Sequence, residues 1–88
     1  MTRRKDIVWQ SVRETPPSLE RITEPTSLGH LEAGSPTSHI LKRNELVTVR
    51  GTADRVVNGI GGRGTVKLVI TAEGDRGWIN WYESEPVV

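Results

Sequence analysis

The sequence changes character near residue 38, and this change constrains the fold more than any other feature. Residues 1–37 are polar and hold four of the five prolines, with no sustained hydrophobic periodicity. Residues 38–88 instead read as short β-strands separated by glycine-rich turns. The sequence therefore predicts a small β-domain at 38–88 and an extended N-terminal arm with little regular structure at 1–37.

Two stretches of the arm carry apolar residues. Residues 7–9 are long enough for one short edge strand. Residues 18–22 favour one or two helical turns, because Leu19 and Ile22 stand three positions apart. Between these stretches, Pro16-Pro17 imposes an extended backbone on the residue before it. The segment that follows, 26–37, is rich in Ser, Thr, Gly and Pro and reads as a loop.

The clearest element of the chain is a β-hairpin over 65–83. Its first strand alternates, with three apolar residues on one face: Val66, Leu68 and Ile70. Residues 72–77 supply turn chemistry, and residues 78–83 form the returning strand. Because Leu68 stands in the middle of the apolar face, we expect it at the centre of the core.

Four or five short strands and no long helix predict an all-β fold, a small barrel. At this size an SH3-like barrel is the first choice, and an OB-like barrel is the second because it needs more residues and often a helix. Apolar residues make up only 34% of the chain. The domain should therefore be marginally stable, and association into a homodimer is expected to help stabilise it.

The residue types exclude several kinds of chemistry. The chain has no cysteine, so disulfides and thiolate metal sites are excluded. His30 and His39 lie on different segments without a third ligand at a diagnostic spacing, so no metal site is predicted. No activated nucleophile is visible. The prediction is a protein that is not an enzyme and uses no cofactor.

The glycine-rich loop at 59–64 superficially suggests a phosphate cradle. Such cradles require a helix N-terminus directly after the glycines, whereas a β-strand follows here. The loop is therefore interpreted as an inter-strand connection. Arg63, at its tip, remains able to contact a phosphate or a carboxylate.

Neither hydropathy nor charge points to a membrane or to a strong electrostatic field. No apolar run approaches the roughly 18 residues that a membrane helix needs. The basic start lacks the apolar stretch of a signal peptide, so we expect a cytoplasmic protein. The net charge is +1, and residues 51–88 carry four basic and five acidic groups.

Two segments resemble a known kind of protein. Residues 42–51, with their VTVRG strand, resemble the opening strand of many SH3-like barrels, and residues 77–82 are similar to the Gly-Trp strand of such folds. Together they resemble small SH3-like β-barrel proteins encoded by actinobacteriophages. The resemblance implies a fold and a phage origin, with an accessory or host-directed role during infection, but no activity.

Aromatic residues of the last strand are the candidate binding site. If Ile79 and Trp81 point into the core, then Trp78 and Tyr82 form an exposed aromatic pair on the other face. The opposite assignment leaves Trp81 outside. In a third arrangement the N-terminal arm covers the pair, with Trp9 or with Leu19 and Ile22 as the cover.

The predicted function is a macromolecular interaction module that binds a protein, including a protein of a bacterial host. The binding residues would be Trp78 and Tyr82, with Arg63 and Lys67 as further contacts. The alternative is a nucleic-acid-binding barrel, in which the aromatic pair stacks on bases and five cations track phosphates: Arg3, Arg4, Lys5, Arg63 and Lys67. The near-neutral charge of residues 51–88 argues against this alternative.

Overall fold

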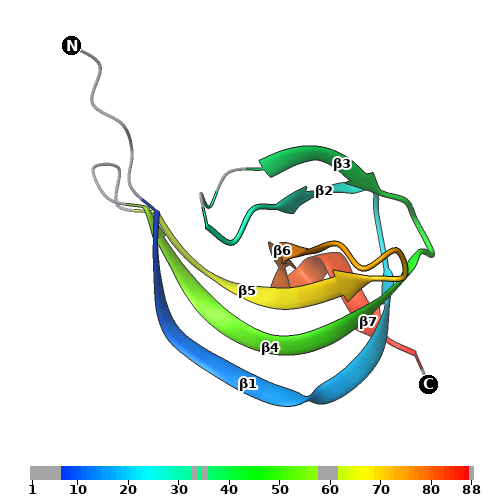
Figure 1. Ribbon diagram of the computed structural model, residues 1–88, viewed down its shortest axis with the longest axis horizontal. Helices are drawn as coiled ribbons and strands as arrows, with labels where there is room; N and C mark the ends of the chain where they lie inside the picture. The colour runs from blue at the N-terminus through cyan, green and yellow to red at the C-terminus, as the bar shows by residue number, and fades with distance from the viewer. Residues whose placement is uncertain (1–6, 33, 35, 58–61, 88) are drawn as a thin grey trace.

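The computed structural model describes residues 7–32, 34, 36–57 and 62–87; Ile7, Val57, Gly62 and Arg63 are described by their backbone only. The described residues form one antiparallel sheet in the order β3-β2-β6-β5-β4-β1-β7 (Figure 1). Its elements are β1 (Ile7–Ile22), β2 (Thr26–Gly29), β3 (Pro36–Leu41), β4 (Leu46–Val57), β5 (Gly62–Thr71), β6 (Arg76–Asn80), the 3₁₀ helix η1 (Trp81–Glu83) and β7 (Ser84–Pro86). The all-β prediction is confirmed, with seven strands instead of four or five. The sheet is not closed, because β3 and β7 are its two edges.

The prediction that residues 1–37 form an extended arm with little regular structure is wrong for the residues that the structure describes. β1 is the longest strand and pairs antiparallel with β4 from Ile7↔Val57 to Arg21↔Leu46. Two interruptions of the register absorb residues that do not suit a ladder. Ser11, with a φ of 52°, lies in the first, and Pro16-Pro17 lies in the second. Proline has no N–H for a ladder, so an interruption is where a strand tolerates it.

The predicted helical turns at residues 18–22 are also wrong, because this stretch is the end of β1. Positions three apart share a face of a helix but lie on opposite faces of a strand. Leu19 is accordingly 50% exposed while Ile22 is fully buried. The predicted loop at 26–37 contains β2 and the start of β3, which pair with each other.

The predicted hairpin is confirmed as β5 and β6. The two strands pair from Val66↔Asn80 to Ile70↔Arg76, and their turn lies between Thr71 and Arg76. The returning strand ends at Asn80, three residues earlier than predicted, and η1 follows. The Glu83 carboxylate accepts a hydrogen bond of 2.8 Å from the Asn80 N–H, which holds this turn of the chain.

Buried side chains gather in two clusters on opposite faces of the sheet. The first cluster contains Ile22, Leu28, Leu41, Val47, Val49, Val69 and Ile79. The second contains Ala53, Val66 and Trp78, with Trp9, Leu31 and Leu68 packed against it. Ile79 and Trp78 are adjacent in β6, so their side chains point to opposite faces. The prediction of one buried face centred on Leu68 is therefore wrong: Val69, on the other face, is more deeply buried than Leu68.

Figure 1 shows β1, β4 and β5 as a curved layer, with β2 and β3 facing its concave side. The β2–β3 hairpin is connected to the other strands through a single pair between β2 and β6, Gly29↔Trp78. A glycine is required there, because a Cβ on Gly29 would lie 2.0 Å from the Trp78 ring. In the described part of the chain no helix is long and apolar enough to cross a membrane.

Candidate functional site: a groove lined by arginines

Trp78 is not part of an exposed aromatic pair. Its side chain is only 4% exposed, and its indole N–H donates a 3.2 Å hydrogen bond to the His30 carbonyl. Trp9 packs edge-on against it, with ring centroids 5.9 Å apart. The expectation of an exposed Trp78–Tyr82 pair is therefore wrong for Trp78. Of the three arrangements weighed from the sequence, cover by Trp9 is the one seen at this residue.

The exposed aromatic pair is instead Trp81 and Tyr82. Their rings meet edge to face at 5.9 Å, and the two residues are 60% and 62% exposed. Trp78 and Tyr82 would share a face only if the strand continued to Tyr82. β6 instead ends at Asn80, and the next residues form η1. Trp81 is therefore outside, as in the opposite assignment, but that assignment is wrong for Tyr82, which is outside as well, and for Ile79, which is fully buried.

Lys67 is committed to an internal network. Its Nζ lies 2.6 Å from Glu20 Oε1 and donates hydrogen bonds of 3.1 and 3.0 Å to the carbonyl and hydroxyl of Ser84. The Ser84 hydroxyl donates to the same Glu20 oxygen at 2.8 Å. The Lys67 and Glu20 side chains are 16% and 9% exposed. Lys67 is therefore occupied within the fold, and the predicted role of Arg63 lies outside the described side chains.

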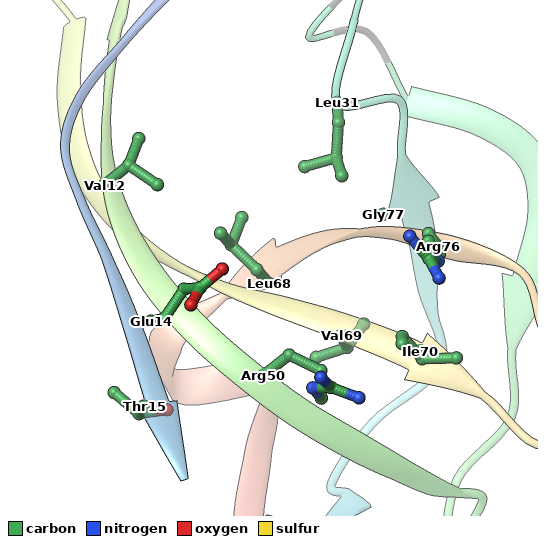
Figure 2. Close-up of a pocket in the computed structure, with 10 residues that line it drawn as sticks. All are labelled: Val12, Glu14, Thr15, Leu31, Arg50, Leu68, Val69, Ile70, Arg76 and Gly77. Atoms are coloured by element: carbon green, nitrogen blue, oxygen red, sulfur yellow. The ribbon is translucent and has the colours of Figure 1, made fainter. Parts of the chain in front are cut away.

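A pocket of about 320 Å³ opens on the concave side of the sheet (Figure 2). It lies between the curved layer of β1, β4 and β5 and the segment that carries Leu31. Figure 2 shows Val12 and Arg76 on opposite sides of this pocket, with Leu68 between them. The lining residues are Val12, Glu14, Thr15, Leu31, Arg50, Leu68, Val69, Ile70, Arg76 and Gly77. We call this pocket the groove.

The floor of the groove is apolar. Leu68 and Ile70 are two residues apart on β5 and are half-buried, so both keep surface that faces the groove. Leu31 contributes from the β2–β3 connection, and Val12 from β1 is 62% exposed. The groove continues from the second buried cluster, to which Leu31 and Leu68 also belong. Apolar area is therefore available for a ligand without any rearrangement of the core.

The rim of the groove carries two exposed arginines. Arg50 lies at a shift of the β4–β5 register, between the pairs Val49↔Val69 and Gly51↔Leu68. Such an irregularity re-aims a side chain relative to a regular strand. Arg76 lies opposite Ile70 on β6 and is exposed. Within the described residues no ion pair joins either guanidinium to a carboxylate.

Sequence reasoning missed this groove because its lining comes from β1, the β2–β3 connection, β4, β5 and β6. Nothing local marks these positions. The alternation in β5 does place Leu68 and Ile70 on one face, and that was the only usable signal. The arrangement offers guanidinium donors beside apolar surface, which suits binding of an acidic and apolar group.

A separate group of potential metal ligands lies at the β5–β6 turn. One ligand atom each from His39, Glu73 and Asp75 lies within 4.8 Å of the others, and His39 Nδ1 is 3.4 Å from Asp75 Oδ2. The sequence spacing could not show this, because His39 comes from β3. Glu73 and Asp75 are exposed and His39 is partly exposed. Such exposed groups are common without an ion, so we assign no metal to them.

Comparison of the chain with protein-family models, with curated proteins and with solved structures finds no match.

Proposed function

We propose that this protein is a non-enzymatic interaction module that binds a protein partner in the groove. The observation that carries the proposal is an open pocket of about 320 Å³ in which an apolar floor adjoins two exposed arginines. Recognition sites commonly combine apolar surface with a few polar groups that fix orientation. Arginine is also enriched at protein interfaces relative to the rest of the surface.

Several features favour a protein over a nucleic acid. Trp78 is buried and packs edge-to-face against Trp9, so Trp78 offers no free face for a base. Lys67 is held by Glu20 and cannot track a phosphate backbone. The groove also carries a carboxylate, Glu14, and the chain has a net charge of only +1. A binder of phosphate chains would be expected to concentrate positive charge.

The proposal includes an SH3-like arrangement of the strands. In support of it, β4, β5 and β6 follow one another as antiparallel neighbours, and η1 then leads into β7. β7 returns to the end of β1, from Glu20↔Pro86 to Ile22↔Ser84. The β2–β3 hairpin takes the place of a long loop between β1 and β4. From the resemblance to phage proteins we also propose a cytoplasmic partner in a bacterial host.

The proposal is tested by selecting ligands for the immobilised protein from a displayed library of random dodecapeptides. Affinities of selected peptides are then measured by fluorescence anisotropy against wild type and against the double variant Val12→Ser/Ile70→Ser. Ile40→Ser is the matched control, since Ile40 is 52% exposed on β3 and does not line the groove.

We expect selected peptides to bind the control as they bind wild type, and the groove variant at least about tenfold more weakly, which corresponds to ~1.4 kcal/mol. Circular dichroism establishes that all three proteins are folded. Equal binding by wild type and the groove variant would contradict the proposal. A fourth protein, Trp81→Ser/Tyr82→Ser, is measured with the same peptides and is also checked by circular dichroism; loss of binding in this variant alone would move the binding site to the exposed aromatic pair.

A further inference from the structure

Positive charge predominates on the groove side of the sheet. Arg50 and Arg76 line the groove, and Arg55 lies nearby with its guanidinium carbon 4.6 Å from the centroid of the Trp78 ring. Trp78 is the β6 partner of Leu68, so Arg55 is on the same face as the groove floor. Glu14 is the one acidic residue among the lining residues. The excess of guanidinium groups complements a ligand that carries carboxylates.

Guanidinium groups recognise carboxylates specifically. The planar fork of an arginine can donate two parallel hydrogen bonds to one carboxylate, which a lysine ammonium cannot reproduce. Arg50 and Arg76 are not engaged in ion pairs within the described residues, so both forks are available to a ligand. They stand on different strands, on either side of the β5 residues that form the floor.

The size of the groove favours an extended segment. An α-helix with its side chains is roughly 10–12 Å across, whereas about 320 Å³ is near the lower limit of ligand pockets. In an extended chain alternate side chains face the same way, about 6.6–6.8 Å apart. Arg76 is the β6 partner of Ile70, so the floor and this arginine are immediate neighbours. The nearest two ligand residues that face the same way, and so fit an apolar contact at the floor and a contact at the arginine, are two positions apart.

We infer that the groove binds an extended polypeptide segment in which an apolar residue and an aspartate or glutamate stand two positions apart. The apolar side chain contacts Leu68 and Ile70, and the carboxylate contacts Arg50 or Arg76. This inference rests on the proposed function and specifies the chemistry of the partner.

The test repeats the random dodecapeptide selection with wild type and with two charge-reversal variants. The double variant Arg50→Glu/Arg76→Glu reverses the charge of the two residues at the rim of the groove. Arg43→Glu is the control, because Arg43 is exposed in the β3–β4 turn and does not line the groove. All three proteins should unfold at the same temperature, since the substituted side chains are exposed. An oligothymidylate of 12 nucleotides serves as the nucleic-acid probe.

We expect peptides selected on wild type and on the control to be enriched in Asp or Glu two positions from an apolar residue. Peptides selected on the double variant should instead be enriched in Lys or Arg. A peptide selected on wild type should lose about tenfold or more in affinity for the double variant and less than twofold for the control.

Three results would overturn the inference, and they differ in what they leave standing. Peptides that need Val12 and Ile70 but show no acidic enrichment would refute the carboxylate contact and leave the proposed function intact. If no peptide is selected, or if the selected peptides bind every groove variant as they bind wild type, both the inference and the proposed function are refuted. Tighter binding of the oligothymidylate than of any peptide, with a steep salt dependence, would establish the nucleic-acid alternative instead.

Discussion

The ion pair of Lys67 and Glu20 gives the sharpest prediction for stability. Replacing Lys67 with Met removes the ammonium group from Glu20 Oε1, 2.6 Å away, and from both oxygens of Ser84. The carboxylate is left in a side chain that is 9% exposed, with the Ser84 hydroxyl as its remaining donor. Removing one partner of a buried pair costs about 3–5 kcal/mol, and a similar loss is expected here because the Glu20 carboxylate stays buried with a single hydroxyl as its compensation.

A loss of this size is a large part of the total stability. A domain of this length is expected to have about 4–13 kcal/mol of unfolding free energy, at roughly 0.05–0.15 kcal/mol per residue. The melting temperature should fall by about 12–40 °C, since 1 kcal/mol corresponds to roughly 4–8 °C in domains of 60–100 residues. Urea unfolding followed by circular dichroism measures the free energy directly.

Two further variants decide whether burial of the charge is the cause. Arg21→Met removes the cation of an exposed pair, Arg21–Glu85, and should cost at most about 1 kcal/mol. Glu20→Leu/Lys67→Met removes both buried charges and should be more stable than Lys67→Met alone. The reasoning is refuted if Lys67→Met unfolds with less than about 1 kcal/mol of loss, or if the double variant is no more stable than the single one.

Three other outcomes follow from the structure. Gly29→Ala should cost about 1–3 kcal/mol in chemical unfolding, because its Cβ would lie 2.0 Å from the Trp78 ring, whereas Gly64→Ala should be nearly neutral since nothing lies within 4 Å. Amide exchange should be slowest where β5 pairs with β4 and β6, and fast exchange there would contradict the sheet order. If the chain dimerises through its exposed aromatic pair, Trp81→Ser/Tyr82→Ser should abolish the dimer in sedimentation; a wild-type monomer at all concentrations would remove that hypothesis.

The hairpin of β5 and β6 was predictable because its signals are local. Strict alternation, β-branched residues and a glycine-bearing turn all occur within 65–83. β1 was not predictable in this way, because each register shift changes which residues face the core and so destroys a period of two. The prolines that seemed to exclude a strand lie at such a shift, where no ladder hydrogen bond is needed.

The candidate site was less accessible to sequence reasoning than the fold. Whether Trp81 faces solvent depends on where β6 ends. The hydrogen bond from the Asn80 N–H to Glu83 belongs to a capping box, whose N-x-x-E spacing is visible in the sequence but was not recognised inside a stretch interpreted as a continuous strand. From the sequence, Lys67 was interpreted as a free cation, because its partner Glu20 is distant in sequence and belongs to a segment that was expected to be helical. Arg50 faces the groove beside a bulge that only the paired strands reveal.

The two interruptions in β1 bear on how the protein behaves when concentrated. β7 covers the outer edge of β1 only from Glu20 to Ile22, and among the described residues no strand pairs with the preceding part of that edge. An uncovered strand edge that is long and regular is a template for intermolecular strand pairing. Ser11 in a left-handed conformation and the Pro16-Pro17 pair break its row of hydrogen-bonding groups. The same irregularities that concealed β1 in the sequence therefore protect the folded chain against stacking into fibrillar aggregates.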